Sequence, residues 1–293
     1  MKSVSVVVIT YNEEKNIEDC LNSLVSQDYP KGKYEIIVVD ASLDKTAELA
    51  SKFKNVKVHK SKEKGFAVQR NLGIKLAKNE LIASTDADCI APRDWLKRLV
   101  SSLEKNNVSG VGGSAFPPKD SCYIGLCIAC LGFPAGGALG LNKNDSISIG
   151  NSIFYKKVLE DVNGFNPNMK YGGEDTDLTK RLKKKGYKII IEPDLFVYHK
   201  TRNFKEFLSW CFRRGKAKFH LSKSPVQILM PLAILIYPFN SKFWRVVTKR
   251  KAIKIDLFSV FLVVPCLFFL RQVFMTLGWS YEFARCFIRK EKY

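Results

Sequence analysis

The chain has 293 residues, of which 46% are apolar and 26% are charged, a globular composition that excludes an intrinsically disordered protein. Its net charge of +20 is concentrated in residues 200–293, which contain 19 Lys or Arg and 4 Asp or Glu, against 29 and 24 in the first 199 residues. A basic tail suits an anionic membrane or a nucleic acid. Here its basic residues alternate with long apolar runs instead of forming a groove-reading motif, so we expect no nucleic-acid partner.

The cysteines and the N-terminus indicate a reducing, intracellular environment. The eight cysteines are scattered through apolar segments without the spacing of a four-ligand zinc site, and a chain of this length does not need disulfides. We therefore expect buried thiols. The apolar run at 4–9 is too short for a signal peptide and indicates a first strand, which leaves the folded domain in the cytoplasm.

Residues 4–85 alternate between apolar runs and amphipathic segments. Buried strands are predicted at 4–9, 34–39, 56–59 and 81–85, and helices at 13–26, 45–53 and 65–77. Helices of this length between strands imply a parallel sheet of right-handed βαβ units, and hence an α/β fold. Asp44 stands where it can cap the second of these helices.

After residue 108 the pattern changes, because glycines and prolines interrupt it as far as about residue 141. Beyond this point a strand is predicted at 146–154, helices at 156–161 and 175–185, and further strands at 187–191 and 195–198. We place boundaries near residues 110 and 200, which divides the chain into 1–110, 111–200 and 201–293.

The basic tail holds two apolar stretches, 226–239 and 257–270, each about 14 residues long and so below the roughly 20 needed to cross a bilayer. Prolines interrupt both stretches, and Arg271 follows the second. Two ordinary spans would put the basic segment between them on the side of the membrane that positive charge avoids. The sequence therefore predicts a monotopic or re-entrant attachment to the membrane surface.

Acidic side chains follow two of the predicted strands. Asp40 ends the strand at 34–39, and Asp86-Ala87-Asp88 follows the strand at 81–85. Open α/β sheets bind ligands at this carboxyl edge, where Asp40 or Asp86 could accept hydrogen bonds from a nucleoside, although Asp40 could equally be a turn residue. Two carboxylates one residue apart can hold a hard divalent cation together with substrate phosphates. The acidic residues at this edge therefore predict a site for a nucleotide diphosphate that is bound through a metal ion.

A second acidic cluster, Glu174-Asp175-Thr176-Asp177, follows two glycines at a predicted helix start, where the helix dipole stabilises carboxylates. One acid would satisfy the cap, so three favour an acid–base role, in which a carboxylate takes the proton of an acceptor hydroxyl. His199 ends a strand and could reach the same metal or diphosphate, although a lone histidine is more often structural. Arg70 could clamp a phosphate or a base, or could be an exposed helix residue.

Seven short motifs occur in a characteristic order: Val7-Val8-Ile9-Thr10-Tyr11-Asn12-Glu13, Val38-Val39-Asp40-Ala41-Ser42, Arg70-Asn71-x-Gly73, Asp86-Ala87-Asp88, Gly150-Asn151, Gly164-Phe165 and Gly173-Glu174-Asp175-x-Asp177-Leu178. In this combination, residues 3–200 resemble the family 2 inverting glycosyltransferases. The resemblance implies a GT-A fold, which is Rossmann-like with a mostly parallel sheet flanked by helices. It also implies a nucleotide-diphosphate sugar donor and Mg²⁺ or Mn²⁺.

The resemblance also implies roles for parts of the chain and for single residues. Residues 1–110 would bind the nucleotide sugar, and 111–200 would bind the acceptor and carry catalysis. Beyond the reach of the resemblance, the composition of 201–293 predicts a basic, apolar, membrane-associated helical region. Asp175 would be the catalytic base with Glu174 beside it, and Asp88 would bind the metal. His199 is expected as a second metal ligand from its position at the end of a strand. Donor contacts are expected from Thr10, Tyr11, Asn12, Glu13, Asp40, Arg70, Asp86 and Ala87, and acceptor contacts from Trp210, Arg213 and Arg214.

Two departures narrow the expected activity. The segment 210–215 stands where processive synthases of the family carry Q-x-x-R-W, but no Gln precedes a Trp by four residues, which argues for transfer of a single sugar. The Gly-Glu-Asp segment favours an enzyme that extends a lipid-linked glycan or polysaccharide over the alternative, a dolichyl-phosphate type of polyprenyl-phosphate monosaccharide synthase. The expectation is a metal-dependent, inverting hexosyltransferase on the membrane, with its catalytic domain in the cytoplasm.

Overall fold

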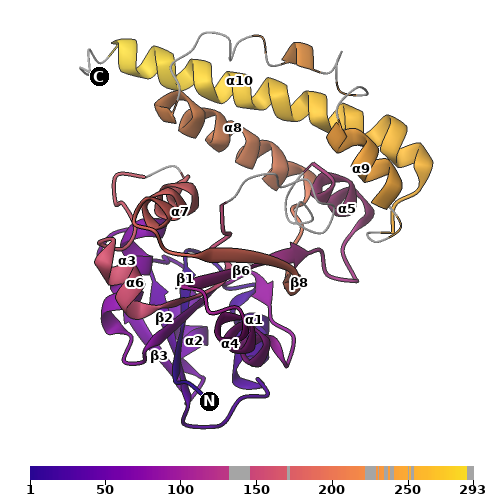
Figure 1. Cartoon of the computed structure of the whole chain (residues 1–293). Helices are drawn as coiled ribbons and strands as arrows, with labels where there is room; N and C mark the ends of the chain where they lie inside the picture. The colour runs from indigo at the N-terminus through magenta and orange to yellow at the C-terminus, as the bar shows by residue number, and fades with distance from the viewer. Residues whose placement is uncertain are drawn as a thin grey trace. The chain divides into compact units, whose positions relative to one another are not determined.

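The structure is a computed structural model that describes residues 1–131, 146–169, 172–221, 229, 231–233, 237, 241–249, 251 and 254–288. The chain forms two compact units. The first unit comprises Met1–Phe116 and Asn144–His199, and the second comprises Pro117–Lys143 and Lys200–Tyr293. Figure 1 shows the sheet of the first unit and the long helices of the second.

The first unit is built on one mixed sheet. Among the described residues its strands are β1 (Val4–Thr10), β2 (Tyr34–Asp40), β3 (Val56–Lys60), β4 (Leu81–Asp86), β5 (Cys89–Ile90), β6 (Gly110–Phe116), β7 (Asn151–Tyr155) and β8 (Ile189–His199). They lie in the order β3-β2-β1-β4-β7-β6-β8-β5. The strands β1 to β4 are parallel, as the alternation of strands and helices predicts, whereas β7 runs antiparallel to both β4 and β6.

Helices cover both faces of this sheet because neighbouring strand residues point to opposite sides. Val4, Val6 and Val8 of β1 belong to a core that includes α1 (Ile17–Val25) and α4 (Trp95–Lys105). Val7 and Ile9 belong to the core on the other face, which includes α3 (Phe66–Leu76), α6 (Lys156–Asp161) and α7 (Glu174–Lys184). The short helix α2 (Thr46–Ser51) connects β2 to β3 (Figure 1). The GT-A-like arrangement of a sheet between helical layers is thus confirmed.

Several predicted elements differ from those observed. The glycine-rich stretch after residue 108 begins with β6, a strand that the pattern failed to predict because small residues replace the expected apolar ones. A Cβ at Gly110 would collide with the ring of Phe154, and one at Gly113 would collide with the carbonyl of Leu195, so close packing requires these glycines. Helix α4 also escaped prediction.

Other predictions had the right element with the wrong ends. The helix predicted from residue 13 begins at Ile17, because residues 11–16 form turns. Of the predicted strand 146–154, only residues 151–154 lie in the sheet, as part of β7. The two strands predicted at 187–191 and 195–198 are one strand, β8, whose pairing with β6 shifts register where Pro193 lies.

The second unit is helical in the residues described: α5 (Tyr123–Ala129), α8 (Phe204–Leu221), α9 (Ser241–Lys249), the π-helical turn η3 (Ser259–Val263) and α10 (Val264–Ile288). Figure 1 shows α8 and α10 side by side. They approach closely because Gly215 packs on the carbonyl of Met275 and Gly278 packs on that of Phe212, where a Cβ would collide.

The predicted apolar stretches of the tail are only partly described. Of 226–239, the structure describes residues 229, 231–233 and 237. The stretch 257–270 continues as helix through Arg271 to Ile288, and Pro265 lies next to η3, where a wider turn relieves its clash with the preceding turn. Of the helices described, only Ser259–Ile288 is long and apolar enough to cross a membrane, by length and composition. Monotopic attachment stays a prediction.

Candidate active site

The ends of β1 and β2 form a rigid edge that can receive a nucleoside. Thr10 and Asp40 face each other in register, and the Thr10 hydroxyl donates to Oδ1 of Asp40 at 2.6 Å. Gln69, which the motifs did not single out, donates to the carbonyls of Thr10 at 2.8 Å and Val39 at 2.9 Å. The second carboxylate oxygen of Asp40 is buried without a partner among the described residues. Such an acceptor suits a ligand N–H or hydroxyl.

The loop after β1 forms hydrogen bonds with the loop after β2. Asn12 adopts a left-handed conformation with φ of 58°, accepts from the backbone N–H of Leu43 at 2.9 Å and donates its own N–H to Ser42 at 2.8 Å. The ammonium of Lys64 lies 3.2 Å from the centre of the Tyr11 ring. Burial, and then the negative charge of Asp88, raise the pKa of Glu13 to about 7. The predicted donor segment Thr10–Glu13 thus borders the acids that follow β4.

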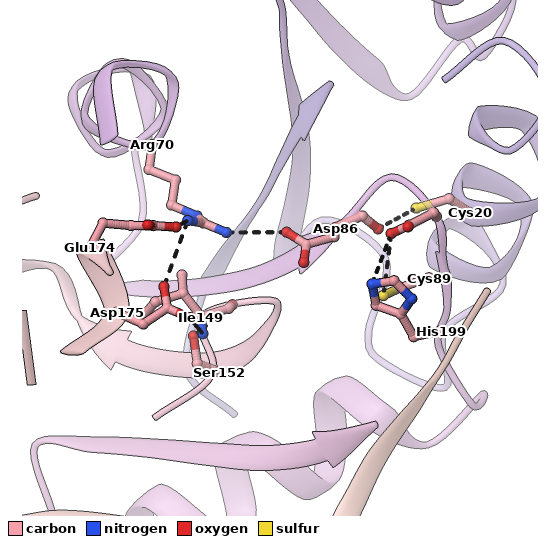
Figure 2. A network of polar contacts seen from close by, with 10 residues as sticks. Cys20, Arg70, Asp86, Cys89, Ile149, Ser152, Glu174, Asp175 and His199 are labelled. Carbon is pink, nitrogen blue, oxygen red and sulfur yellow. Dashed lines mark hydrogen bonds and ion pairs between the residues drawn. The ribbon is translucent and has the colours of Figure 1, made fainter. Parts of the chain in front are cut away.

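Arg70 is the centre of the polar network (Figure 2). Its guanidinium, only 7% exposed, donates to Glu174 at 2.7 Å and to Asp86 at 3.1 Å, and lies 3.8 Å from Asp175. The arginine is therefore not an exposed helix residue. It joins the acid at the end of β4 to the acids at the start of α7.

Asp175 occupies the first turn of α7, as predicted, because Gly173 takes a left-handed conformation with φ of 98° that starts the helix. Its Oδ2 accepts from the backbone N–H of Ile149 at 3.5 Å, while its buried Oδ1 has no hydrogen-bond partner among the residues described. Burial raises the pKa of Asp175 to about 7, with Glu174 and Asp86 acting in the same direction and Arg70 opposing them. A carboxylate with such a pKa is suited to accept a proton near neutral pH.

The predicted metal residues meet at the other end of the acidic triplet. Residues 89 and 199 are register partners of β5 and β8, which brings Nε2 of the buried His199 to 3.3 Å from Oδ1 of Asp88. The ligand atoms of Asp88, Cys89 and His199 all lie within 4.8 Å of one another. Carboxylate and imidazole are ligands that suit Mn²⁺. Burial raises the pKa of the Cys89 thiol, which therefore stays protonated and is a poor ligand for a hard cation.

Several motif residues turn out to hold the site in place. Asn71 brackets the backbone of Phe165 with two hydrogen bonds of 2.7 Å, and Asn151 donates to the carbonyls of Ser114 and Leu195. The side chain of Ala87 is 3% exposed within the core, so only its backbone could contact a donor. The spacing of such residues cannot separate a ligand contact from a structural one.

The predicted acceptor residues Trp210, Arg213 and Arg214 all lie on α8 in the second unit. Trp210 has the guanidinium carbon of Arg202 at 5.0 Å from its ring centre and that of Arg214 at 5.5 Å. Arg213 and Arg214 are exposed.

Comparison with known proteins agrees with this geometry. Residues 5–124 match the model of glycosyl transferase family 2, and residues 141–207 match that of the N-terminal domain of galactosyltransferase. The chain is 33% identical to glycosyltransferase AglE of Haloferax volcanii over 74% of this chain and 73% of that protein. It is 27% identical, over the same shares, to the dolichyl N-acetyl-alpha-D-glucosaminyl phosphate 3-beta-D-2,3-diacetamido-2,3-dideoxy-beta-D-glucuronosyltransferase of Methanococcus voltae.

Among solved structures, the mannosyltransferase PcManGT of Pyrobaculum calidifontis in complex with GDP-Man and Mn²⁺ superposes with a TM-score of 0.60. The alignment covers 96% of this chain and 87% of that one at 23% identity, which supports the shared fold. From the family match and the extent of its likeness to AglE, the chain belongs to glycosyl transferase family 2 and is a glycosyltransferase.

Proposed function

We propose that this enzyme transfers a single sugar, with inversion, from a nucleotide-diphosphate sugar to a hydroxyl of a lipid-linked glycan. The observation that carries the proposal is the convergence of Asp86, Glu174 and Asp175 on the buried Arg70, which joins the donor edge of the sheet to a carboxylate able to act as a base. The likeness to the Methanococcus protein supports a lipid-linked acceptor, because that protein is named for transfer to a dolichyl-phosphate-linked sugar.

The donor would lie along the carboxyl edge of β1, β2 and β4. Asp40 offers the nucleoside a buried oxygen that has no hydrogen-bond partner within the described ranges, and Asp86 offers a carboxylate that Arg70 holds in place. Solved structures of the fold support a nucleotide sugar, since PcManGT holds GDP-Man and the TarS protein of Staphylococcus aureus holds UDP-GlcNAc. The segment Thr10–Glu13 would close the edge beside the nucleotide.

The chemical step that we propose is a direct displacement. The acceptor oxygen forms a bond to the anomeric carbon, the bond from that carbon to the diphosphate oxygen breaks, and the acceptor proton passes to Asp175. The Oδ1 of Asp175, which accepts no hydrogen bond from the described residues and lies 3.8 Å from Arg70, is the atom that would take this proton. Asp88 and His199 would hold Mg²⁺ or Mn²⁺, and such an ion supplies positive charge to the departing diphosphate.

The base distinguishes this reaction from that of a polyprenyl-phosphate monosaccharide synthase. A phosphate acceptor is already ionised at neutral pH and needs no group to remove a proton, whereas a hydroxyl does. The raised pKa of Asp175 and its position at the start of α7 therefore favour a hydroxyl acceptor.

We further propose that the second unit attaches the enzyme to the membrane surface and that the first unit lies in the cytoplasm. The helix Ser259–Ile288 is apolar, and the segment 242–254 before it is rich in Lys and Arg. Sealed inside-out vesicles test the attachment: with a monotopic arrangement, protease cleaves within 242–254, whereas protection of that segment would contradict it.

Acceptor specificity provides the experiment for the reaction. The purified enzyme, with UDP- or GDP-sugars and Mn²⁺, is offered a polyprenyl phosphate and the same polyprenyl carrying a phosphate-linked sugar. We expect transfer only to the linked sugar, inverted stereochemistry in the product, and loss of turnover in Asp175→Asn. Asp161→Asn is the matched control, since Asp161 pairs with Lys185 at the surface. Transfer to the bare polyprenyl phosphate, undiminished in Asp175→Asn, would contradict the proposal.

A further inference from the structure

The long apolar helix of the second unit, Ser259–Ile288, turns its charged residues away from its exposed side. It contains three of them, Arg271, Glu282 and Arg285. Glu282 is only 1% exposed and forms ion pairs with Arg285 and with Lys216 of α8. Arg271 donates to the carbonyl of Leu131 at 2.9 Å. A helix that borders water has the opposite arrangement, with its charges outside and its apolar residues in the core.

The exposed side of the same helix is apolar along its whole length. We call this side the outer face, and it consists of Phe261, Leu262, Cys266, Phe269, Leu277, Tyr281, Phe283, Ala284, Phe287 and Ile288. The exposed fraction of its large side chains runs from 41% for Phe269 to 78% for Ile288. A continuous apolar surface of this kind marks a site of interaction with a protein or a membrane.

Helix α8, the partner of α10, has a polar exposed side. Apart from Phe204 at its start, the exposed side chains described on α8 are polar: Lys205, Glu206, Ser209, Arg213 and Arg214. The two helices together therefore have one apolar side and one basic side, which is the pattern of a helix that lies in a membrane interface. Cations beside an apolar surface suit the headgroups of an anionic bilayer.

The point at which the two helices touch decides how they can lie in a bilayer. Gly215 of α8 packs on the carbonyl of Met275, close to the middle of α10. The exposed Arg213 and Arg214 immediately precede Gly215, so they lie beside the middle of the long helix. If this helix crossed the bilayer, both guanidinium groups would lie near the centre of the hydrocarbon, where a charge is costly.

We propose that α8 and α10 lie together in the plane of the membrane interface. The outer face enters the acyl chains of an anionic bilayer, and the basic side of α8 stays among the headgroups and water. The 19 Lys or Arg against 4 acids in residues 200–293 favour such a bilayer over a second copy of the chain, which would bring like charges together. The inference rests on the membrane attachment proposed above and names the surface that makes it.

Flotation of the full chain with vesicles of mixed phosphatidylglycerol and phosphatidylcholine tests the outer face. Phe269→Gln should weaken vesicle binding about tenfold or more, because a large apolar side chain no longer enters the hydrocarbon. Phe269→Leu should bind like the wild type. Ser209→Gln is the matched control, since it places the same residue on the exposed side of α8 and should leave binding unchanged.

The depth of labels along the outer face distinguishes an in-plane helix from a spanning one. Cys122 and Cys266 are the exposed cysteines, so Cys122→Ser leaves Cys266 for a fluorescent label. Phe261→Cys, Leu277→Cys and Phe287→Cys, each made with Cys266→Ser added, carry the label to other levels. We expect quenching by spin-labelled lipids to place every label at one depth, about 5–10 Å below the headgroups.

A deep label at residue 277 with shallow labels at 261 and 287 would overturn the proposal. These two positions lie about 39 Å apart along a helix, so such a result would mean that the helix spans the bilayer. Equal vesicle binding by the wild type and Phe269→Gln would also overturn it. If that variant changed only the mass of an oligomer, the outer face would contact a second copy of the chain instead.

The same samples separate this inference from the rest of the proposed function. Phe269→Gln should keep Mn²⁺-dependent binding of the nucleotide sugar, whereas Asp88→Asn should lose the donor and still bind vesicles. Vesicle binding that survives every change on the outer face would remove only this surface, and attachment through another part of the second unit would stand. Normal vesicle binding without any donor binding would remove only the proposed reaction.

Discussion

Replacing Arg70 by glutamine should destabilise the first unit and shift the pH dependence of the enzyme together. The guanidinium and its partner Glu174 are 7% and 9% exposed and 2.7 Å apart, and removing one member of such a buried pair costs about 3–5 kcal/mol. The pair with Asp86, whose side chain is 32% exposed, adds only about 0–1 kcal/mol. The melting temperature should therefore fall by about 6–20 °C.

The catalytic effect follows from the charge that the substitution removes. Arg70 holds down the pKa of Asp175, which burial raises to about 7. Without Arg70 this pKa rises further, so less of the base is ionised at pH 7 and the rising limb of the pH–rate profile moves to higher pH. Arg70→Lys, which keeps a charge but loses the fork of donors, should show smaller changes of both kinds.

Urea unfolding and pH–rate profiles of purified variants measure these effects. Lys75→Gln is the control, because Lys75 is an exposed cation on the same helix α3 and its loss should change stability by less than about 0.5 kcal/mol. If Arg70→Gln unfolds at the urea concentration of the wild type and keeps its pH profile, Arg70 does not join the donor edge to the base.

Three further predictions concern single side chains. The pKa of Asp175 is raised above its ordinary value, so ionisation of its carboxyl lowers the free energy of unfolding as pH rises from about 4 through 7. Asp175→Asn should abolish turnover. In urea titrations its free energy of unfolding should exceed that of the wild type by about 1–2 kcal/mol at pH 8 and equal it at pH 4. His199→Ala should weaken Mn²⁺ binding about tenfold or more by calorimetry, because one of two close ligands is lost, and unchanged affinity would exclude the histidine from the site. A Cβ at Gly150 would collide with the carboxylate of Asp86, so Gly150→Ala should raise the donor Kd about 10- to 100-fold with little loss of stability; an unaltered Kd would mean that Asp86 does not contact the donor.

The sequence predicted most where local pattern and tertiary structure agree. The apolar runs of β1, β2 and β4 are buried on both faces, so their parallel pairing and the acids at their ends followed from the alternation of strands and helices. The position of three acids in the first turn of α7 could also be predicted, because a glycine followed by a polar cluster is typical of a helix start.

What escaped prediction depends on contacts between distant segments. The glycines of β6 are typical of a loop, and only the packing of Phe154 and Leu195 against them explains why they form a strand. Gln69 differs from a surface residue only through its bonds to the carbonyls of Thr10 and Val39.

Arg70 illustrates the same point within the site. Its position in the helix indicated a clamp for the nucleotide or an exposed residue, whereas its partners on β4 and α7 lie 16 and 104 residues away in the chain. A contact with the nucleotide stays a prediction, and the pairing of Arg70 with three acids could be found only from the folded sheet.

The proposed reaction requires that Asp88 and His199 hold a metal that binds a nucleotide-diphosphate sugar at the edge of the sheet. The most direct measurement is thermal stabilisation by a panel of UDP- and GDP-sugars with Mn²⁺, for the wild type and Asp88→Asn, since a ligand of the native state raises its stability by mass action. We predict that one donor raises the melting temperature of the wild type only when Mn²⁺ is present, and that Asp88→Asn shows no such rise. No shift with any donor, or an equal shift in Asp88→Asn, would show that Asp88 does not hold a metal that binds the donor.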